Sequence, residues 1–232
     1  MKKFGLIGGT SWHSTVEYYS MINHEVNEFY GNNTNPPLHL VNLNQRKITD
    51  LQELGKWDEV ADIYIAAARD LEAVGVEGIA FCANTPHKVY EEVQLEIDVP
   101  VLHIADAVGE FIQSKGFASV GLLGTRFTME DDFIRKRLLE GFGIQTIVPH
   151  QEDQHKMHQG LHWEMVMGNF PETLQYFFLE VIDHLAAEGA EAVILGCTEF
   201  PLLLQDCTSR IPYVDSVVCH VEAIVEFIMG GE

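Results

Sequence analysis

The chain has 232 residues, of which 47% are hydrophobic and 21% charged, and it carries a formal net charge of −21. These proportions are ordinary for a globular protein with a substantial core, and no apolar run approaches the roughly 20 residues that a membrane-spanning helix needs. Because 14 Lys and Arg stand against 35 Asp and Glu, the chain lacks the basic clusters that bind nucleic acid or anionic membranes, and we expect neither as a partner.

Short apolar runs alternate with amphipathic stretches along the whole chain. The expected strands are 3–7, 38–43, 78–81, 99–103, 119–123, 145–148, 192–195 and 212–214. The expected helices are 14–29, 57–73, 105–114, 129–140, 156–167, 172–187 and 216–228. Runs that are apolar throughout and separated by helices are typical of parallel strands buried on both faces. The expected fold class is therefore α/β.

The sequence also contains an internal repeat. Segment 73–85, AVGVEGIAFCANT, aligns without a gap with segment 187–199, AEGAEAVILGCTE. The identical pairs are Ala73/Ala187, Gly75/Gly189 and Glu77/Glu191. Two shorter matches have nearly the same offset: 5–8 with 121–124, and 99–102 with 211–214. We therefore expect two pseudo-symmetric α/β lobes, 1–102 and 103–210, each a parallel sheet flanked by helices. The final segment, 211–232, could complete either lobe, the first being one possibility.

Parallel sheets bind ligands at the carboxyl ends of their strands. Four loops follow expected strands directly: 8–10, 84–85, 124–125 and 197–199. If the two lobes face one another, these loops meet in a single active-site cleft. The turn Gly8-Gly9-Thr10-Ser11 could offer backbone N–H groups to an anion. It is neither GxGxxG nor a Walker A loop, which disfavours a nucleotide and leaves a carboxylate ligand or a plain tight turn.

The four cysteines are Cys82, Cys197, Cys207 and Cys219. They form no CxxC pair and no zinc-type spacing, so we interpret them as reduced thiols of a cytoplasmic protein and expect no metal.

Cys197 ends a strand and precedes Thr198 and Glu199 at a helix start. The N–H groups and helix dipole there could stabilise its thiolate, although a buried structural cysteine is the common alternative. Its counterpart in the repeat is Ala83. Because neighbouring strand side chains point to opposite faces, Cys82 is expected to point into its own lobe.

Several other polar residues lie near these loops. His87 and His103 could transfer a proton or cap a helix. With few basic residues in the chain, Arg46, Lys47 and Lys156 are candidate partners of a carboxylate.

Four motifs occur in order along the chain: Ile7-Gly-Gly-Thr-Ser-Trp-His-Ser-Thr15 with Tyr18-Tyr19, Cys82-Ala-Asn-Thr-Pro-His87, Leu123-Gly-Thr-Arg-Phe-Thr-Met129 and Leu195-Gly-Cys-Thr-Glu199. With them, essentially the whole chain resembles the cofactor-independent aspartate/glutamate racemase family, in particular its amino-acid racemase branch. The resemblance implies two pseudo-symmetric lobes, a homodimer, a small amino-acid or dicarboxylate substrate, and no pyridoxal phosphate or other cofactor.

In that family two cysteines face each other across the substrate Cα, so that one thiolate removes a proton and the other thiol returns one from the opposite face. The resemblance makes Cys197 the second cysteine and places Ala83 at the first, directly after Cys82. Alanine cannot transfer a proton, and three routes stay open. Cys82 could reach the substrate; Thr85, His87 or a water could act on that face; or Cys197 could act alone, as one cysteine does in the related arylmalonate decarboxylases.

The resemblance also assigns substrate contacts. The positions that match substrate-holding groups of the family are Thr10, Asn84, Thr85, Thr125, Lys156, Thr198 and Glu199, whereas Arg46 lies in a loop that departs from the family pattern. The resemblance therefore implies a racemase or epimerase for aspartate, glutamate or a related amino acid. The alternatives are a one-cysteine decarboxylase or isomerase of the same superfamily, and a carboxylate-binding protein that has lost catalysis.

Overall fold

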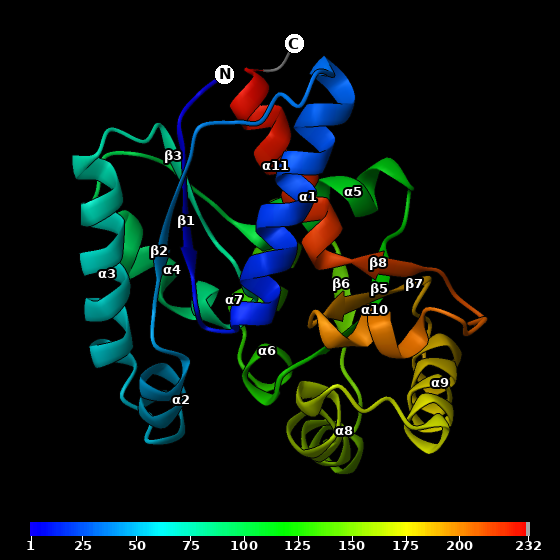
Figure 1. Ribbon diagram of the computed structural model, residues 1–232. Helices are drawn as coiled ribbons and strands as arrows, with labels where there is room; N and C mark the ends of the chain where they lie inside the picture. The colour runs from blue at the N-terminus through cyan, green and yellow to red at the C-terminus, as the bar shows by residue number, and fades with distance from the viewer. Residues whose placement is uncertain (231–232) are drawn as a thin grey trace. The chain divides into compact units, whose positions relative to one another are not determined.

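The computed structural model describes residues 1–230, apart from the side chains of His162 and Val166, and it forms two compact units (Figure 1). One unit contains Met1–His103 together with the chain from His220 onward, and the other contains Ile104–Cys219. Each unit holds a four-stranded parallel sheet flanked by helices. All eight expected strands are present, and the expected α/β class is confirmed.

The sheet of the first unit has the strand order β2-β1-β3-β4. Its strands are β1 (Phe4–Gly8), β2 (Leu38–Asn42), β3 (Gly78–Phe81) and β4 (Val101–Leu102). Helix α3 (Trp57–Ala73) covers one face, and α1 (Trp12–Tyr30) and α11 (Ser216–Met229) lie on the other (Figure 1). Two shorter helices, α2 (Gln45–Glu53) and α4 (Tyr90–Gln94), pack beside α3.

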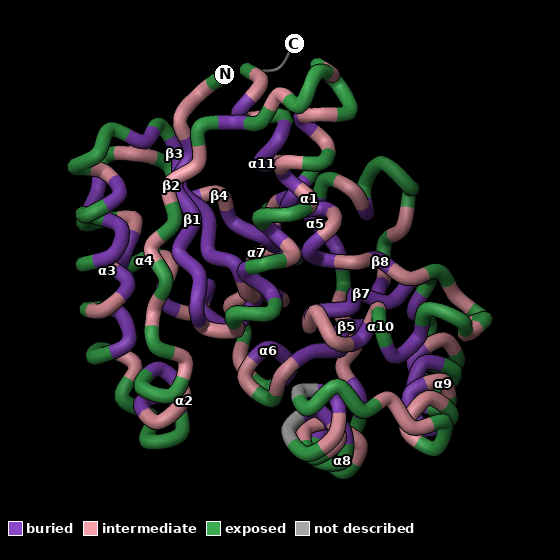
Figure 2. Tube along the Cα trace, viewed as in Figure 1, coloured by how far each residue is buried: buried purple, intermediate pink, exposed green. Residues whose placement is uncertain are grey.

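The two central strands of this sheet are buried along their whole length (Figure 2). Ile7 and Phe81 pack against Tyr64 of α3 in one apolar cluster. On the other face the ring of Phe4 meets that of Phe227 of α11 edge-on, with centroids 5.7 Å apart. Burial on both faces explains why these strands are apolar throughout rather than alternating.

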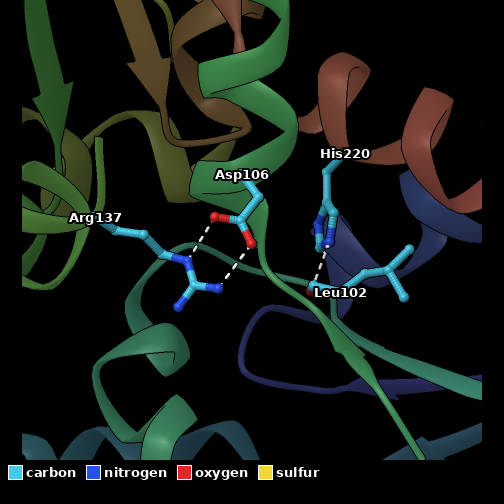
Figure 3. Close-up of polar contacts among 4 residues, drawn as sticks. All are labelled: Leu102, Asp106, Arg137 and His220. Carbon is cyan, nitrogen blue, oxygen red and sulfur yellow. Dashed lines mark hydrogen bonds and ion pairs between the residues drawn. The ribbon is translucent and has the colours of Figure 1, made fainter. Parts of the chain in front are cut away.

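The sheet of the second unit repeats this topology as β6-β5-β7-β8. Its strands are β5 (Ser119–Gly124), β6 (Gln145–Ile147), β7 (Ala192–Gly196) and β8 (Tyr213–Asp215). Strands β5 and β7 share an apolar cluster with α8 (Gln151–Trp163), α9 (Glu172–Ala187) and α10 (Glu199–Leu204). Helices α5 (Ile104–Ser114) and α7 (Phe133–Phe142) are joined by a bidentate ion pair in which Arg137 Nε and Nη2 lie 2.6 and 2.7 Å from the Asp106 carboxylate (Figure 3).

Two of the identical pairs in the repeat, Gly75/Gly189 and Glu77/Glu191, have the same structural role in both units. Gly75 and Gly189 both adopt positive φ, 76° and 105°, in the turn that follows α3 or α9, a conformation that glycine adopts at little cost. Glu77 Oε1 accepts a hydrogen bond from Lys3 N at 3.0 Å, before β1. Glu191 Oε2 accepts from Ala118 N and Ser119 N at 2.7 and 3.1 Å, at the start of β5.

Some expected helix boundaries are wrong. The helix expected at 129–140 is two helices, α6 (Arg126–Glu130) and α7, because Asp131 is extended, with φ −85° and ψ 159°, and aspartate favours helix ends over helix interiors. The helix expected at 156–167 begins at Gln151 and ends at Trp163, and the 3-10 helix η2 (Met165–Met167) follows it. Helices α2, α4 and α10 and the 3-10 helix η1 (Thr85–Val89) were not expected.

The final segment of the chain is divided. Strand β8 pairs with β7 and so completes the second sheet. From His220 onward, α11 packs within the first unit, where Lys2 N donates to Ile228 O at 2.8 Å.

Within residues 1–230 no helix combines the length and the apolar character needed to cross a membrane. In the same part of the chain, no three or more His, Cys, Asp or Glu side chains are grouped in a way that could hold a metal ion.

Candidate functional site

The residues singled out from the sequence lie mainly where strands end. In the first unit, Thr10 follows β1, Arg46 follows β2, and the segment 83–87 follows β3. In the second unit, Thr125 follows β5 and Cys197 follows β7. Each unit thus gathers its polar candidates at the carboxyl edge of its own sheet, the edge at which parallel sheets bind ligands.

The turn after β1 is rigid and internally bonded. Gly9 has φ +86°, and a Cβ there would lie 2.2 Å from Leu43 O, so only glycine fits. Its N–H donates to Thr15 Oγ1 at 2.9 Å. The hydroxyl of Thr10 bonds that of buried Tyr64, a partner that the sequence analysis missed because α3 is remote in the chain. The turn therefore holds Thr10 in a fixed place at the sheet edge.

Cys82 and Ala83 differ sharply in exposure. Cys82 is 2% exposed, and burial raises the pKa of its thiol. Ala83 is partly exposed. The thiol at position 82 is thus both sealed in the core of its unit and held in its protonated form.

Asn84, Thr85 and His87 are all buried and belong to or adjoin the 3-10 helix η1. His87 Nδ1 lies 3.1 Å from Asn84 O. The carbonyl of Cys82, the residue before Ala83, accepts a hydrogen bond from the hydroxyl of Ser14 at 2.6 Å. Ser14 was not among the candidate site residues, although it lies in the Ser-Trp-His-Ser-Thr motif that singled out this region.

The thiol of Cys197 is hydrogen-bonded to a carboxylate. Cys197 Sγ donates to Glu199 Oε2 at 2.9 Å, and Thr198 Oγ1 donates to the same oxygen at 3.0 Å. Burial raises the pKa of Cys197 well above its ordinary value, and the charge and hydrogen bond of Glu199 raise it further. The N–H groups of Glu199 and Thr198 act in the opposite direction but are outweighed. The expected stabilisation of the thiolate by the helix start is therefore present, but it is weaker than the effects that raise the pKa of the thiol.

Thr125 lies beside Cys197 at the same sheet edge. Gly124 and Gly196 are paired in the register of β5 and β7, so the next residue of each strand, Thr125 or Cys197, leaves the sheet at the same level. Thr125 Oγ1 accepts from Thr128 N at 3.3 Å and lies 3.0 Å from Thr128 Oγ1. The second unit thus presents a thiol with hydroxyl groups on the neighbouring loop and on the next residue.

The three candidate cations, Arg46, Lys47 and Lys156, are all exposed. Arg46 is 85% exposed and pairs with Asp50, Nε to Oδ1, at 2.9 Å. Lys156 is also exposed, with its ammonium 3.8 Å from the centroid of the Phe177 ring. These contacts orient both side chains while leaving them accessible to an anion.

Comparisons with known proteins agree on one family. The family model described as Asp/Glu/Hydantoin racemase matches residues 7–224. The chain is 29% identical, over 72% of its length and 72% of the relative's, to the broad-specificity amino-acid racemase RacX of Bacillus subtilis (strain 168). Among solved structures, a protein from Yersinia pestis provisionally assigned as an Asp/Glu racemase has 38% identity and a TM-score of 0.92, covering 99% of this chain and 100% of that one. An aspartate racemase homologue from Pyrococcus horikoshii OT3 has 36% identity and a TM-score of 0.84, with the same coverage. By sequence and by fold, this chain belongs to the Asp/Glu/Hydantoin racemase family.

Proposed function

We propose that this protein is a cofactor-independent racemase or epimerase of aspartate, glutamate or a related amino acid, with Cys197 as its acid/base. Family membership and the racemase activities named for its relatives support an amino-acid substrate. The observation that carries the assignment is the thiol of Cys197, hydrogen-bonded to Glu199 at the carboxyl edge of β7.

Because its pKa is raised, Cys197 is protonated before the reaction and can act as a proton donor. A Cα carbanion takes the proton from Sγ, leaving a thiolate, and in the reverse direction the thiolate removes the Cα proton. Because burial and the nearby Glu199 raise the pKa of Cys197, the thiolate is scarce but is a stronger base when it forms. The hydroxyls of Thr125 and Thr198 and the amide of Asn84, together with Thr10, Thr85 and the cations Lys156 and Arg46, would hold the carboxylate and amine groups of the substrate.

The opposite face of the substrate lacks a matching acid. Ala83 has no proton to transfer, and Cys82 is buried and protonated. A positioned acid or base typically contributes about 10²–10⁴-fold in rate, so we expect Cα exchange from the Cys197 face to outpace inversion. Thr85 or a water would serve the other face, because Nδ1 of the buried His87 is bonded to Asn84 O.

The test is Cα deuterium exchange of L- and D-aspartate and of L- and D-glutamate in D₂O, followed by NMR together with chiral analysis. Cys197→Ala is expected to abolish exchange, and Cys82→Ala to leave most of it. Cys207→Ala is the matched control, because Cys207 is a partly exposed free cysteine of the same unit as Cys197. Equal losses from Cys197→Ala and Cys82→Ala would contradict the assignment of Cys197 alone.

The same assay separates the alternatives. Exchange with inversion identifies a racemase, and exchange with retention identifies a one-face acid/base. CO₂ release from an arylmalonate identifies a one-cysteine decarboxylase, which needs a proton donor on a single face only. Tight amino-acid binding without any exchange identifies a carboxylate-binding protein.

The proposal includes a homodimer, as the family resemblance implies, and a cytoplasmic location, as the interpretation of the four cysteines as reduced thiols implies. Light scattering coupled to size-exclusion chromatography tests the dimer, and fractionation of the producing cells tests the location.

A further inference from the structure

The turn that contains Ala83 is held at a carbonyl on each side. Before Ala83, Ser14 of α1 donates its hydroxyl to Cys82 O at 2.6 Å. After it, Asn84 O receives two contacts at 3.1 Å, from the backbone N–H of His87 and from its ring nitrogen Nδ1. A carbonyl oxygen only accepts, so Nδ1 of His87 carries a proton and donates it. Two side chains thus hold the Cys82–Ala83 peptide group and the Asn84–Thr85 peptide group, one on each side of Ala83.

The ring of His87 is itself locked by other rings of the same unit. Its centroid lies 4.5 Å from that of His103, 5.2 Å from Phe81 and 5.7 Å from His220. These are the separations of packed aromatic side chains. With 2% of His87 exposed, the ring cannot turn away from Asn84 O without displacing its neighbours.

The third of these rings is anchored by hydrogen bonds. His220 Nε2 donates to Leu102 O at 3.0 Å (Figure 3), which leaves Nδ1 as the acceptor of the Tyr18 hydroxyl at 2.9 Å. Tyr18 and His220 have no exposed surface. Tyr18 of α1 and Leu102 of β4 therefore fix the ring of His220 on α11, and His220 packs against His87.

We propose that Ser14 and His87 are positioning residues for the racemase reaction, which hold the turn 82–84 so that Asn84 and Thr85 meet the substrate in one orientation. This inference rests on the proposed function. In this proposal His87 holds the Asn84 carbonyl through its Nδ1 proton. It does not act as the proton relay that its position in the sequence also allows. Ser14 supports the turn from the other side, through Cys82 O.

The experiment compares two replacements of His87 whose amide groups take the places of different ring nitrogens. In His87→Asn the amide nitrogen stands where Nδ1 stood and keeps the bond to Asn84 O, whereas in His87→Gln the amide reaches the place of Nε2. Loss of one neutral hydrogen bond lowers kcat/KM for Cα exchange by about tenfold. We expect that loss in His87→Gln and in Ser14→Ala, and activity within about threefold of the wild type in His87→Asn. Equal losses of 10²-fold or more in kcat for both His87 variants would instead indicate a proton relay and overturn the assignment.

A second readout does not depend on activity. Amide hydrogen exchange of the peptide covering 82–89, measured by mass spectrometry, should accelerate about tenfold in His87→Gln and Ser14→Ala but not in His87→Asn. His24→Gln, an exposed histidine of α1, is the control and should change neither readout. If wild-type protein shows no Cα exchange, the proposed function fails, while the exchange of these amides still decides whether the two residues hold the turn. Unchanged amide exchange in both His87→Gln and Ser14→Ala would overturn the inference.

Discussion

The hydrogen bond between Cys197 and Glu199 makes a prediction about thiol reactivity. Replacing Glu199 by Gln keeps the shape of the side chain but removes the negative charge 2.9 Å from the sulfur. That charge is one of the causes that raise the pKa of Cys197. The Glu199→Gln variant is therefore expected to hold more Cys197 as thiolate at neutral pH than the wild type does.

The increase in the thiolate population of Cys197 in Glu199→Gln has a lower bound. Two unit charges 2.9 Å apart interact by about 1.4 kcal/mol even at the dielectric constant of bulk water, which corresponds to about a tenfold change in thiolate population. Both groups are only partly exposed, so the true interaction is larger. A thiolate also becomes less nucleophilic as its pKa falls, by about the square root of the change. The net alkylation rate at pH 7 should rise by at least about threefold.

The assay is alkylation by iodoacetamide, quantified for each cysteine by peptide mass spectrometry across a range of pH. Cys207 serves as the internal reference, because it is also partly exposed and belongs to the same unit. The wild-type rate for Cys197 should keep rising to a higher pH than the rate for the variant. An unchanged or slower rate in Glu199→Gln at pH 7 would refute the view that Glu199 holds the thiol protonated.

Three further outcomes are expected. Ala83→Cys should raise the rate of inversion by more than about tenfold, since it restores a thiol on the second face of the substrate; unchanged inversion in the chiral assay would count against a missing acid. Gly9→Ala should lower the free energy of unfolding in urea far more than Gly116→Ala. Both glycines have positive φ, but only at Gly9 would the new Cβ meet the backbone, at 2.2 Å from Leu43 O. Similar losses of stability in the two variants would show that the turn at Gly9 can relax. The pKa of Glu191 is lowered by the N–H groups of Ala118 and Ser119, so its contribution to stability is present above pH 4.5 and is lost as the pH falls through the lower folded-state value. The melting temperatures of Glu191→Gln and wild type should therefore differ at pH 7 and converge in acid, with the exposed Glu180→Gln as control; a difference that is constant with pH would disprove this linkage.

The fold was readable from the sequence because its signals are local. A strand buried on both faces must be apolar almost throughout, as the central strands β1, β3, β5 and β7 are. All eight expected strands are present. The repeat was equally visible, since Gly75 and Gly189 meet the same demand for positive φ and Glu77 and Glu191 bond the same place at the start of the first strand. Short helices such as α2 and α10 escaped detection because a few residues carry too little periodicity to be recognised.

The candidate site was only partly readable. The sequence located Cys197, and it identified Ala83 as the departure from the two-cysteine pattern, because both lie in contiguous motifs. It did not indicate that the pKa of Cys197 is raised, since that depends on burial and on where the Glu199 carboxylate lies, not on the adjacency of the two residues. Tyr64 beneath Thr10 and His220 behind His87 come from distant helices, and no local pattern indicates them.

The amino-acid sequence alone therefore indicated the class of fold, its duplication and the position of one candidate catalytic sulfur, each from residues close together along the chain. Only the tertiary structure showed that the last strand pairs within the second sheet, that the last helix packs in the first unit, and that the pKa of Cys197 is raised. The physical reason is that hydrogen bonds, burial and charge act over a few ångströms in space, whereas the residues that interact can be far apart in the chain, as Tyr18 and His220 are at a separation of 202 residues.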